Sequence, residues 1–242
     1  MKLSVQLYTL RDPLTADFEG TLAKVREIGL ENVELAGDFG HSASEWRETL
    51  DRLGLSASGA HIGLALLEED LDKVIADAKT IGFRYVIVPW IGEDAYADGW
   101  AAFGKRLEPL GKKLAEEGLT LCYHNHDFEY KNGDGMTELY GATDPDALKA
   151  EIDAAWVKIG GYDPVETVRA LGSRVPLVHL KDFDPEKTPR WTPAGYGTMP
   201  LIELIAAANE AGAEYGVIEL DESPGDPLEA VRESFVYLSD KV

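Results

Sequence analysis

Short apolar runs alternate with amphipathic segments along the whole chain, and this alternation restricts the possible folds more than any other feature. The apolar or alternating runs have the length and residue types of β-strands. They occupy residues 3–8, 32–37, 55–62, 85–90, 119–124, 148–156, 175–180 and 215–220. The run 85–90 is apolar on both faces, which is typical of a parallel strand buried between two layers.

The segments between these runs repeat their apolar residues at helical spacing. In 18–29, for example, Phe18, Leu22 and Val25 share one helix face, and Gly29 is placed to end the helix. Helices are predicted at 18–29, 44–54 (with Ser44 as N-cap), 67–82, 164–172, 199–212 and 227–240. A longer helical region from 94 to 117 is expected to break near Gly104.

Together the runs and helices make eight strand–helix units of about 30 residues each, which predicts a (β/α)8 TIM barrel. The fifth unit differs, because residues 127–146 predict a shortened helix or a loop. No Pro/Gly/Ser-rich linker divides the sequence, so we expect a single α/β domain over 1–242. An open, doubly wound sheet is the alternative, and eight regular units favour the closed barrel over it.

Charge and composition exclude several classes of function. The formal net charge of −21 opposes binding to nucleic acid or to an anionic membrane surface. Cys122 is the single cysteine, which excludes an internal disulfide and a zinc site built from several cysteines. The first residues, MKLSVQLYTLRD, lack the apolar segment of a secretory leader, and no run is long enough to span a membrane. A cytoplasmic protein is expected.

In a barrel of this type, the chemistry lies at the carboxyl ends of the strands. Four side chains at the ends of successive predicted strands would point inward together: His124, Asp153, His179 and Glu219. Imidazole and carboxylate ligands in this mixture suit Mn²⁺, Zn²⁺, Co²⁺ or Fe²⁺, and Mg²⁺ less well. We therefore predict a divalent metal site made by these four residues. For each residue alone, a hydrogen-bonded group at the barrel rim is the alternative.

The segments around these residues carry a family resemblance. In chain order YHNHDFEY (123–130), EIDAAW (151–156), VHLKDF (178–183) and VIELDE (217–222) resemble motifs of the xylose-isomerase-like sugar phosphate isomerase/epimerase superfamily of TIM barrels. The resemblance extends over nearly the whole chain. It implies a divalent metal held by a Glu on strand five, an Asp on strand six, a His on strand seven and a Glu on strand eight. The last three correspond to Asp153, His179 and Glu219.

Strand five departs from this pattern. Many members of the superfamily read LENH where this chain reads YHNH, so His124 stands at the position of the family glutamate. A branch that resembles inosose dehydratase also has a histidine-rich fifth strand. The resemblance implies an isomerase or epimerase that abstracts a proton next to the carbonyl of a sugar or sugar derivative. A lyase that dehydrates an inosose or keto sugar on the same metal site is the alternative.

The same strand ends supply candidates for proton transfer. Glu219 could act as both ligand and base, with His126 or Glu129 as the partner acid. Lys181 could neutralise the enediolate oxygen, bind an anionic group of the substrate, or pair with Asp182 or Asp153.

Substrate contacts are predicted from residues around the mouth of the barrel. His61 would contact a hydroxyl group, while Trp90 and Trp156 would form apolar walls. Arg190, in the loop 188–198, is a candidate contact for phosphate. The alternatives are a packed histidine and aromatic residues of the core. Glu34 could reach the mouth or pair with a neighbour.

Two further functional classes are alternatives to an isomerase and a lyase. A metal-dependent phosphodiesterase is disfavoured by the acidic charge, and a barrel that only binds a sugar is the non-catalytic alternative. No dinucleotide fingerprint follows the first strand, so a nicotinamide cofactor is not expected. The expected partner is a small sugar-like substrate, and a homo-oligomer is compatible with apolar outer barrel faces.

Overall fold

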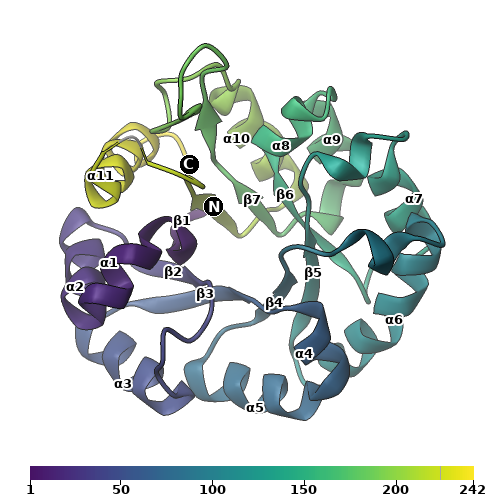
Figure 1. Ribbon diagram of the computed structural model, residues 1–242, viewed down its shortest axis with the longest axis horizontal. Helices are drawn as coiled ribbons and strands as arrows, with labels where there is room; N and C mark the ends of the chain where they lie inside the picture. The colour runs from purple at the N-terminus through teal and green to yellow at the C-terminus, as the bar shows by residue number, and fades with distance from the viewer. Residues whose placement is uncertain (224) are drawn as a thin grey trace.

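The protein is a closed barrel of eight parallel strands surrounded by helices, as the computed structural model shows for residues 1–223 and 225–242 (Figure 1). The barrel order is β1-β10-β7-β6-β5-β4-β3-β2. Pairing of β1 with β10 closes the sheet, which rules out the open doubly wound alternative. The barrel strands are β1 (Lys2–Gln6), β2 (Asn32–Leu35), β3 (Ser56–His61), β4 (Tyr85–Val88), β5 (Thr120–His124), β6 (Lys149–Asp153), β7 (Leu177–His179) and β10 (Tyr215–Ile218). Strands β8 (Asp182–Phe183) and β9 (Trp191–Thr192) form a separate antiparallel pair.

Helices form the outer ring in Figure 1 and bury their apolar faces against the strands. They are α1 (Arg11–Ala16), α2 (Phe18–Ile28), α3 (Ala43–Leu53), α4 (Leu64–Glu69), α5 (Leu71–Ile81), α6 (Trp100–Glu116), α7 (Gly135–Gly141), α8 (Ala154–Ile159), α9 (Pro164–Leu171), α10 (Leu201–Ala211) and α11 (Pro227–Leu238). Single 3-10 turns span Leu7–Leu10, Glu93–Tyr96, Phe128–Tyr130 and Gly172–Arg174. In the described part of the chain, no helix is long and apolar enough to cross a membrane.

Three local predictions about helices need correction. The predicted helix 67–82 is two helices, α4 and α5, because the Asp70 side chain accepts the Lys73 backbone N–H and starts a new helix there. The N-cap of α3 is Ser42, because its hydroxyl accepts the Glu45 backbone N–H while the Glu45 carboxylate accepts the Ser42 N–H at 2.8 Å. This reciprocal pair is a capping box, which Ser44 cannot form. Gly104 does not break α6. It permits close packing on α7, since a Cβ at this position would lie 2.9 Å from the carbonyl oxygen of Leu139.

The sixth barrel strand is shorter than predicted, and the difference fixes the position of Asp153. The predicted strand 148–156 ends at Asp153, and α8 begins at the next residue. The reason is a capping interaction: one carboxylate oxygen of Asp153 accepts the N–H groups of Ala155 and Trp156, both at 3.0 Å. Strand and helix are therefore joined without a loop, and Asp153 is held at the mouth of the barrel.

The barrel interior changes from apolar to polar along the strands. A small interior cluster joins Tyr85 and Ile87 of β4, Cys122 of β5 and Leu177 of β7. Inward-facing residues farther along the strands are histidines and carboxylates. The register places His124 beside Glu151 and Asp153 beside His179. Parallel strands thus gather these polar side chains at the carboxyl end of the barrel, where active sites of this fold lie.

Candidate active site

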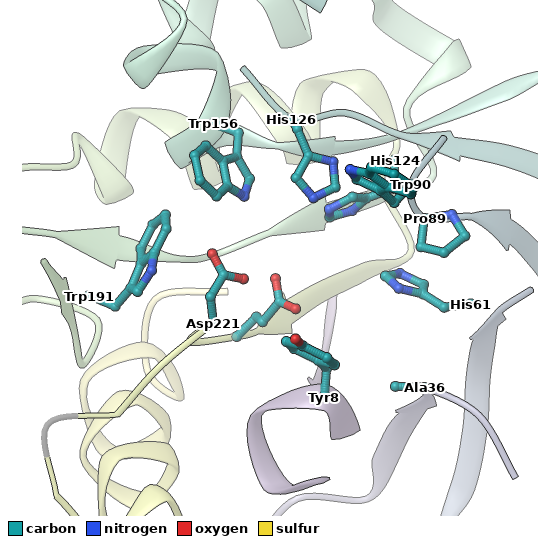
Figure 2. A pocket seen from close by; sticks show the side chains of 11 residues that line it. Tyr8, Ala36, His61, Pro89, Trp90, His124, His126, Trp156, Trp191 and Asp221 are labelled. Atoms are coloured by element: carbon teal, nitrogen blue, oxygen red, sulfur yellow. The ribbon is translucent and has the colours of Figure 1, made fainter. Parts of the chain in front are cut away.

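A pocket of about 590 Å³ opens at the carboxyl end of the barrel (Figure 2). Aromatic rings form much of its wall, and polar groups converge at its base. The aromatic residues are Tyr8, Trp90, Trp156 and Trp191, and the ionisable residues are His61, His124, His126, Glu219 and Asp221. An apolar wall around a few convergent polar groups is the usual composition of a small-molecule site.

The four predicted metal ligands come together, and we call them the upper cluster. Each of His124, Asp153, His179 and Glu219 offers a ligand atom within 4.8 Å of those of the other three. His179 Nδ1 lies 2.9 Å from Glu219 Oε2, and His124 Nε2 lies 3.9 Å from Asp153 Oδ2. All four side chains are buried. Their convergence agrees with the sequence prediction, although the ligand role itself stays a proposal.

A second group of polar residues lies next to the upper cluster, and the sequence reasoning missed its centre, Glu151. Glu151 Oε2 lies 2.9 Å from His61 Nε2, 3.0 Å from His124 Nδ1 and 3.3 Å from His179 Nε2. We call His61, His124, Glu151 and His179 the lower cluster. Glu151 and Asp153 are two residues apart on β6, and the period of a strand could have indicated that they share the inward face.

Glu34 of β2 extends the lower cluster. Its Oε1 atom lies 3.1 Å from His179 Nε2 and 3.3 Å from His61 Nε2, and it accepts a hydrogen bond of 2.8 Å from the Gln6 amide. The sequence left open whether Glu34 reaches the mouth or pairs with neighbours. The carboxylate is completely buried and pairs with the two histidines.

The ammonium group of Lys181 lies among three carboxylates and 4.6 Å from the centre of the Trp191 ring. Nζ lies 3.0 Å from Asp153 Oδ2, 2.8 Å from Glu219 Oε2 and 2.6 Å from Asp221 Oδ1. The side chain is fully buried, and it pairs with Asp153 as one sequence hypothesis expected, but not with Asp182. Lys181 therefore neutralises the carboxylates from beneath and does not line the pocket.

The pKa values reflect burial and crowding of charge. Burial lowers the pKa of both His126 and His124. The pKa of His126 falls to about 4, and the pKa of His124 falls well below its usual value. Burial also opposes protonation of His179, but the carboxylates of Glu151 and Glu219 outweigh it and raise the pKa well above the usual value. For Asp221, burial raises the pKa to about 6 against the pull of Lys181.

Four other predicted site residues do line the pocket, and two do not. His61, Trp90, Trp156 and His126 lie on its wall. Glu129 points away, because its carboxylate accepts the Tyr123 hydroxyl at 2.7 Å and the His126 backbone N–H at 3.0 Å. Arg190 is exposed and lines a neighbouring groove. Trp191, which the sequence reasoning did not single out, lies between that groove and the pocket.

The chemistry of these residues fits a divalent cation. The upper cluster presents two imidazoles and two carboxylates, a donor set suited to a first-row transition metal. Two carboxylate oxygens beside it, Glu34 Oε2 and Glu151 Oε1, are buried and have no hydrogen-bond partner in the described structure. Unpaired buried carboxylate oxygens are costly, so a nearby cation would stabilise the folded protein.

Residues 22–241 match the family model described as the xylose isomerase-like TIM barrel. This match extends over most of the chain. The protein belongs to that family. The carboxyl ends of the strands, where TIM-barrel enzymes carry their active sites, are also where this chain places its polar residues.

The individual proteins that resemble this chain share at most about a quarter of their aligned residues with it. The chain is 25% identical over 186 residues to an inosose dehydratase of Geobacillus kaustophilus, a match that covers 66% of this chain and 60% of the relative. A sugar phosphate isomerase/epimerase from Parabacteroides distasonis superposes with a TM-score of 0.85 at 21% identity, covering 98% and 97% of the two chains. The probable 3-DHS dehydratase AsbF of Bacillus anthracis gives 0.79 at 16% identity over the full length of both. These structures share the fold.

Proposed function

We propose that the protein is a divalent-metal-dependent lyase that dehydrates an uncharged inosose or keto sugar. The observation that carries this proposal is the position of the upper cluster: His124 and Glu219 open into a pocket whose wall also holds His126 and Asp221. The residues that would hold the ion are His124, Asp153, His179 and Glu219. When bound, a divalent ion supplies Lewis acidity, which polarises a substrate carbonyl and makes the adjacent C–H more acidic.

The pocket wall provides one group to take the proton and another to give one. His126 lines the pocket, and burial lowers the pKa of its imidazole to about 4, so the ring is unprotonated near neutral pH and can accept the proton from carbon. Asp221 also lines the pocket, and burial raises its pKa to about 6, so its protonated form can pass a proton to a β-hydroxyl group. The C–O bond then breaks, a C=C bond forms, and water leaves. His126 returns its proton to solvent, and Asp221 is reprotonated.

The absence of free cations on the wall supports an uncharged substrate. Among the described residues that line the pocket, none is a lysine or arginine. The ammonium of Lys181 is already held by three carboxylates. A phosphate group would face Glu219 and Asp221 with no lysine or arginine of the wall to pair with it, so phosphorylated sugars are disfavoured. Trp90, Trp156 and Tyr8 suit the C–H faces of a sugar ring.

An isomerase or epimerase, which the sequence analysis placed first, uses the same proton abstraction and is the second candidate. We place the lyase before the isomerase or epimerase for two reasons. The curated relative is named a dehydratase, and Asp221 supplies an acid positioned separately from the base. In epimerisation the proton returns to carbon, and in dehydration it does not.

The test is turnover of inososes and unphosphorylated keto sugars in deuterated water, followed by NMR with the metal-loaded protein. Dehydration predicts that one hydroxyl-bearing carbon becomes an alkene carbon, which gives an enone product that absorbs ultraviolet light. Deuterium uptake without water loss would replace the lyase by the epimerase. His126→Ala should reduce either reaction at least about 100-fold. His41→Ala, at a histidine that stacks on Phe18 outside this pocket, serves as its control. Turnover only of phosphorylated sugars would contradict the proposal.

A further inference from the structure

His124 and His179 present opposite ring nitrogens to two different groups of residues. Toward the upper cluster, His179 offers Nδ1 to Glu219 and His124 offers Nε2 to Asp153. Toward the lower cluster, His179 Nε2 and His124 Nδ1 both lie within 3.3 Å of Glu151 Oε2. The two rings therefore stand between two sets of ligand atoms, of which only the upper set corresponds to the predicted metal site.

The lower cluster has the dimensions of a coordination shell. Ligands about 2.1 Å from one ion lie about 3.0 Å apart at right angles and about 3.4 Å apart at tetrahedral angles. The three nitrogens lie 2.9, 3.0 and 3.3 Å from Glu151 Oε2, each inside this range or within about 0.1 Å of it. By contrast, Asp153 Oδ2 in the upper cluster lies 3.9 and 4.0 Å from its two histidine nitrogens.

Hydrogen bonding alone gives a poor account of Glu151. Three imidazole nitrogens gather at one of its oxygens, while the other, Oε1, is buried without any partner in the described structure. Donors that serve only as hydrogen-bond partners would be expected to use both oxygens, because each bare buried oxygen is costly. Glu34 shows the same imbalance, since its Oε2 is also buried and unpartnered.

The charges of the lower cluster also lack a permanent counterion. Within the described chain, Glu34 and Glu151 form ion pairs only with histidines. Lys181, which is buried at the base of the pocket, is already engaged by Asp153, Glu219 and Asp221. A divalent ion would compensate the two buried glutamates, and His61 lines the pocket, which provides a route of entry.

We propose that the lower cluster is a second divalent-cation site, with His61 and Glu151 as ligands of its own and His124 and His179 shared with the upper cluster. Three imidazoles and one carboxylate favour Zn²⁺, Co²⁺ or Fe²⁺ over Mg²⁺. A shared ring binds one ion through each nitrogen only after losing its ring proton, so filling both sites together releases ring protons. This inference does not require the proposed reaction to be correct.

The test is titration of the metal-free protein with Co²⁺ alone, with bound cobalt measured by equilibrium dialysis and visible absorption. Three proteins are compared with the wild type. His61→Gln removes a ligand of the lower cluster only, Asp153→Asn removes one of the upper cluster only, and His41→Gln is a matched control outside both. Circular dichroism melting checks the folding of each variant.

The inference predicts that His61→Gln loses one equivalent of cobalt, whereas His41→Gln loses none. Two equivalents in the wild type, one lost in each cluster variant, would support both sites. A single equivalent that needs His61 but not Asp153 would support the lower cluster and overturn the proposed upper metal site. A single equivalent that needs Asp153 but not His61 would overturn this inference and leave the proposed function standing. No bound cobalt would overturn both.

A measurement on the wild type keeps the inference testable if His61→Gln fails to fold. Histidines bound to Co²⁺ give ring N–H and C–H signals shifted far outside the normal proton NMR range. The lower cluster places three histidine rings on the metal, and the upper cluster places two. Signals from His61 among the shifted set would support the second site, and their absence from a cobalt-loaded protein would contradict it.

Discussion

Lys181 and Asp153 form an ion pair of 3.0 Å in which neither side chain reaches solvent. The same ammonium also contacts Glu219 and Asp221, so one lysine compensates three carboxylates at the base of the pocket. A buried pair of this kind adds little stability relative to apolar residues, but loss of one partner leaves uncompensated buried charge. This relationship makes Lys181 the side chain on which the electrostatics of the site depend most.

Lys181→Met should therefore destabilise the metal-free protein by about 3–5 kcal/mol, since Asp153 and Glu219 would lose their common cation. The measurement is urea unfolding of the metal-free variant. Lys158→Met is the control, because that ammonium donates to the Thr198 carbonyl oxygen at the surface and forms no ion pair with a described residue. Its effect should stay below about 1 kcal/mol. Equal stability of the two variants would show that the site does not need the Lys181 charge.

His124→Ala should abolish binding by the upper cluster, since it removes one of four ligands that converge in a buried site. Elemental mass spectrometry of purified wild type, His124→Ala and His41→Ala gives the metal content directly. We expect stoichiometric metal in the wild type and in His41→Ala, and a large loss in His124→Ala. Full retention of metal in His124→Ala would mean that strand five supplies no ligand.

Glu129 should make the protein less stable as the pH rises. Burial raises its pKa to about 7, although the Tyr123 hydroxyl pulls in the other direction. The folded protein thus keeps a proton that the unfolded chain loses above its ordinary pKa of 4.5. By linkage, unfolding free energy falls by about 3 kcal/mol as the pH rises through this window.

Glu129→Gln removes this titration and keeps an acceptor for the His126 N–H, so its stability should depend less on pH. Unfolding curves at several pH values between about 4.5 and 8 measure the slope. Glu48→Gln, at an exposed position on α3, should retain the wild-type slope. If Glu129→Gln retained it as well, the buried carboxyl would not be the titrating group.

Trp90→Ala should weaken substrate binding without disturbing the fold. The indole lines the pocket and is 62% exposed, so it contributes surface to a sugar but little to the core. We expect KM to rise about tenfold with kcat nearly unchanged, as for a contact made equally in ground and transition states. Tyr196→Ala is the comparison, because Tyr196 is an exposed aromatic residue that does not line the pocket. A similar KM change in both would exclude a specific contact.

Much of the fold and the upper cluster follows from local patterns. Strand and helix periods, with glycines such as Gly29 and Gly54 in left-handed C-cap conformations, predict the eight units and their order. Parallel strands then bring their carboxyl ends to one mouth, which is why His124, Asp153, His179 and Glu219 could be grouped before any coordinates were known. Periodicity and chain direction suffice for that grouping.

The lower cluster and the orientation of several side chains depend on tertiary structure. The period of the strand places Glu151 on the inward face of the barrel. Its position along the barrel axis is set by the stagger of the strands in the closed sheet. That position brings Glu151 into contact with His61 across the barrel. Glu129 follows the histidine motif by only three residues, yet its hydrogen bonds to Tyr123 and the backbone turn it away from the pocket. Local sequence specifies which face a residue occupies; the residues it meets there come from distant strands brought together by closure of the barrel.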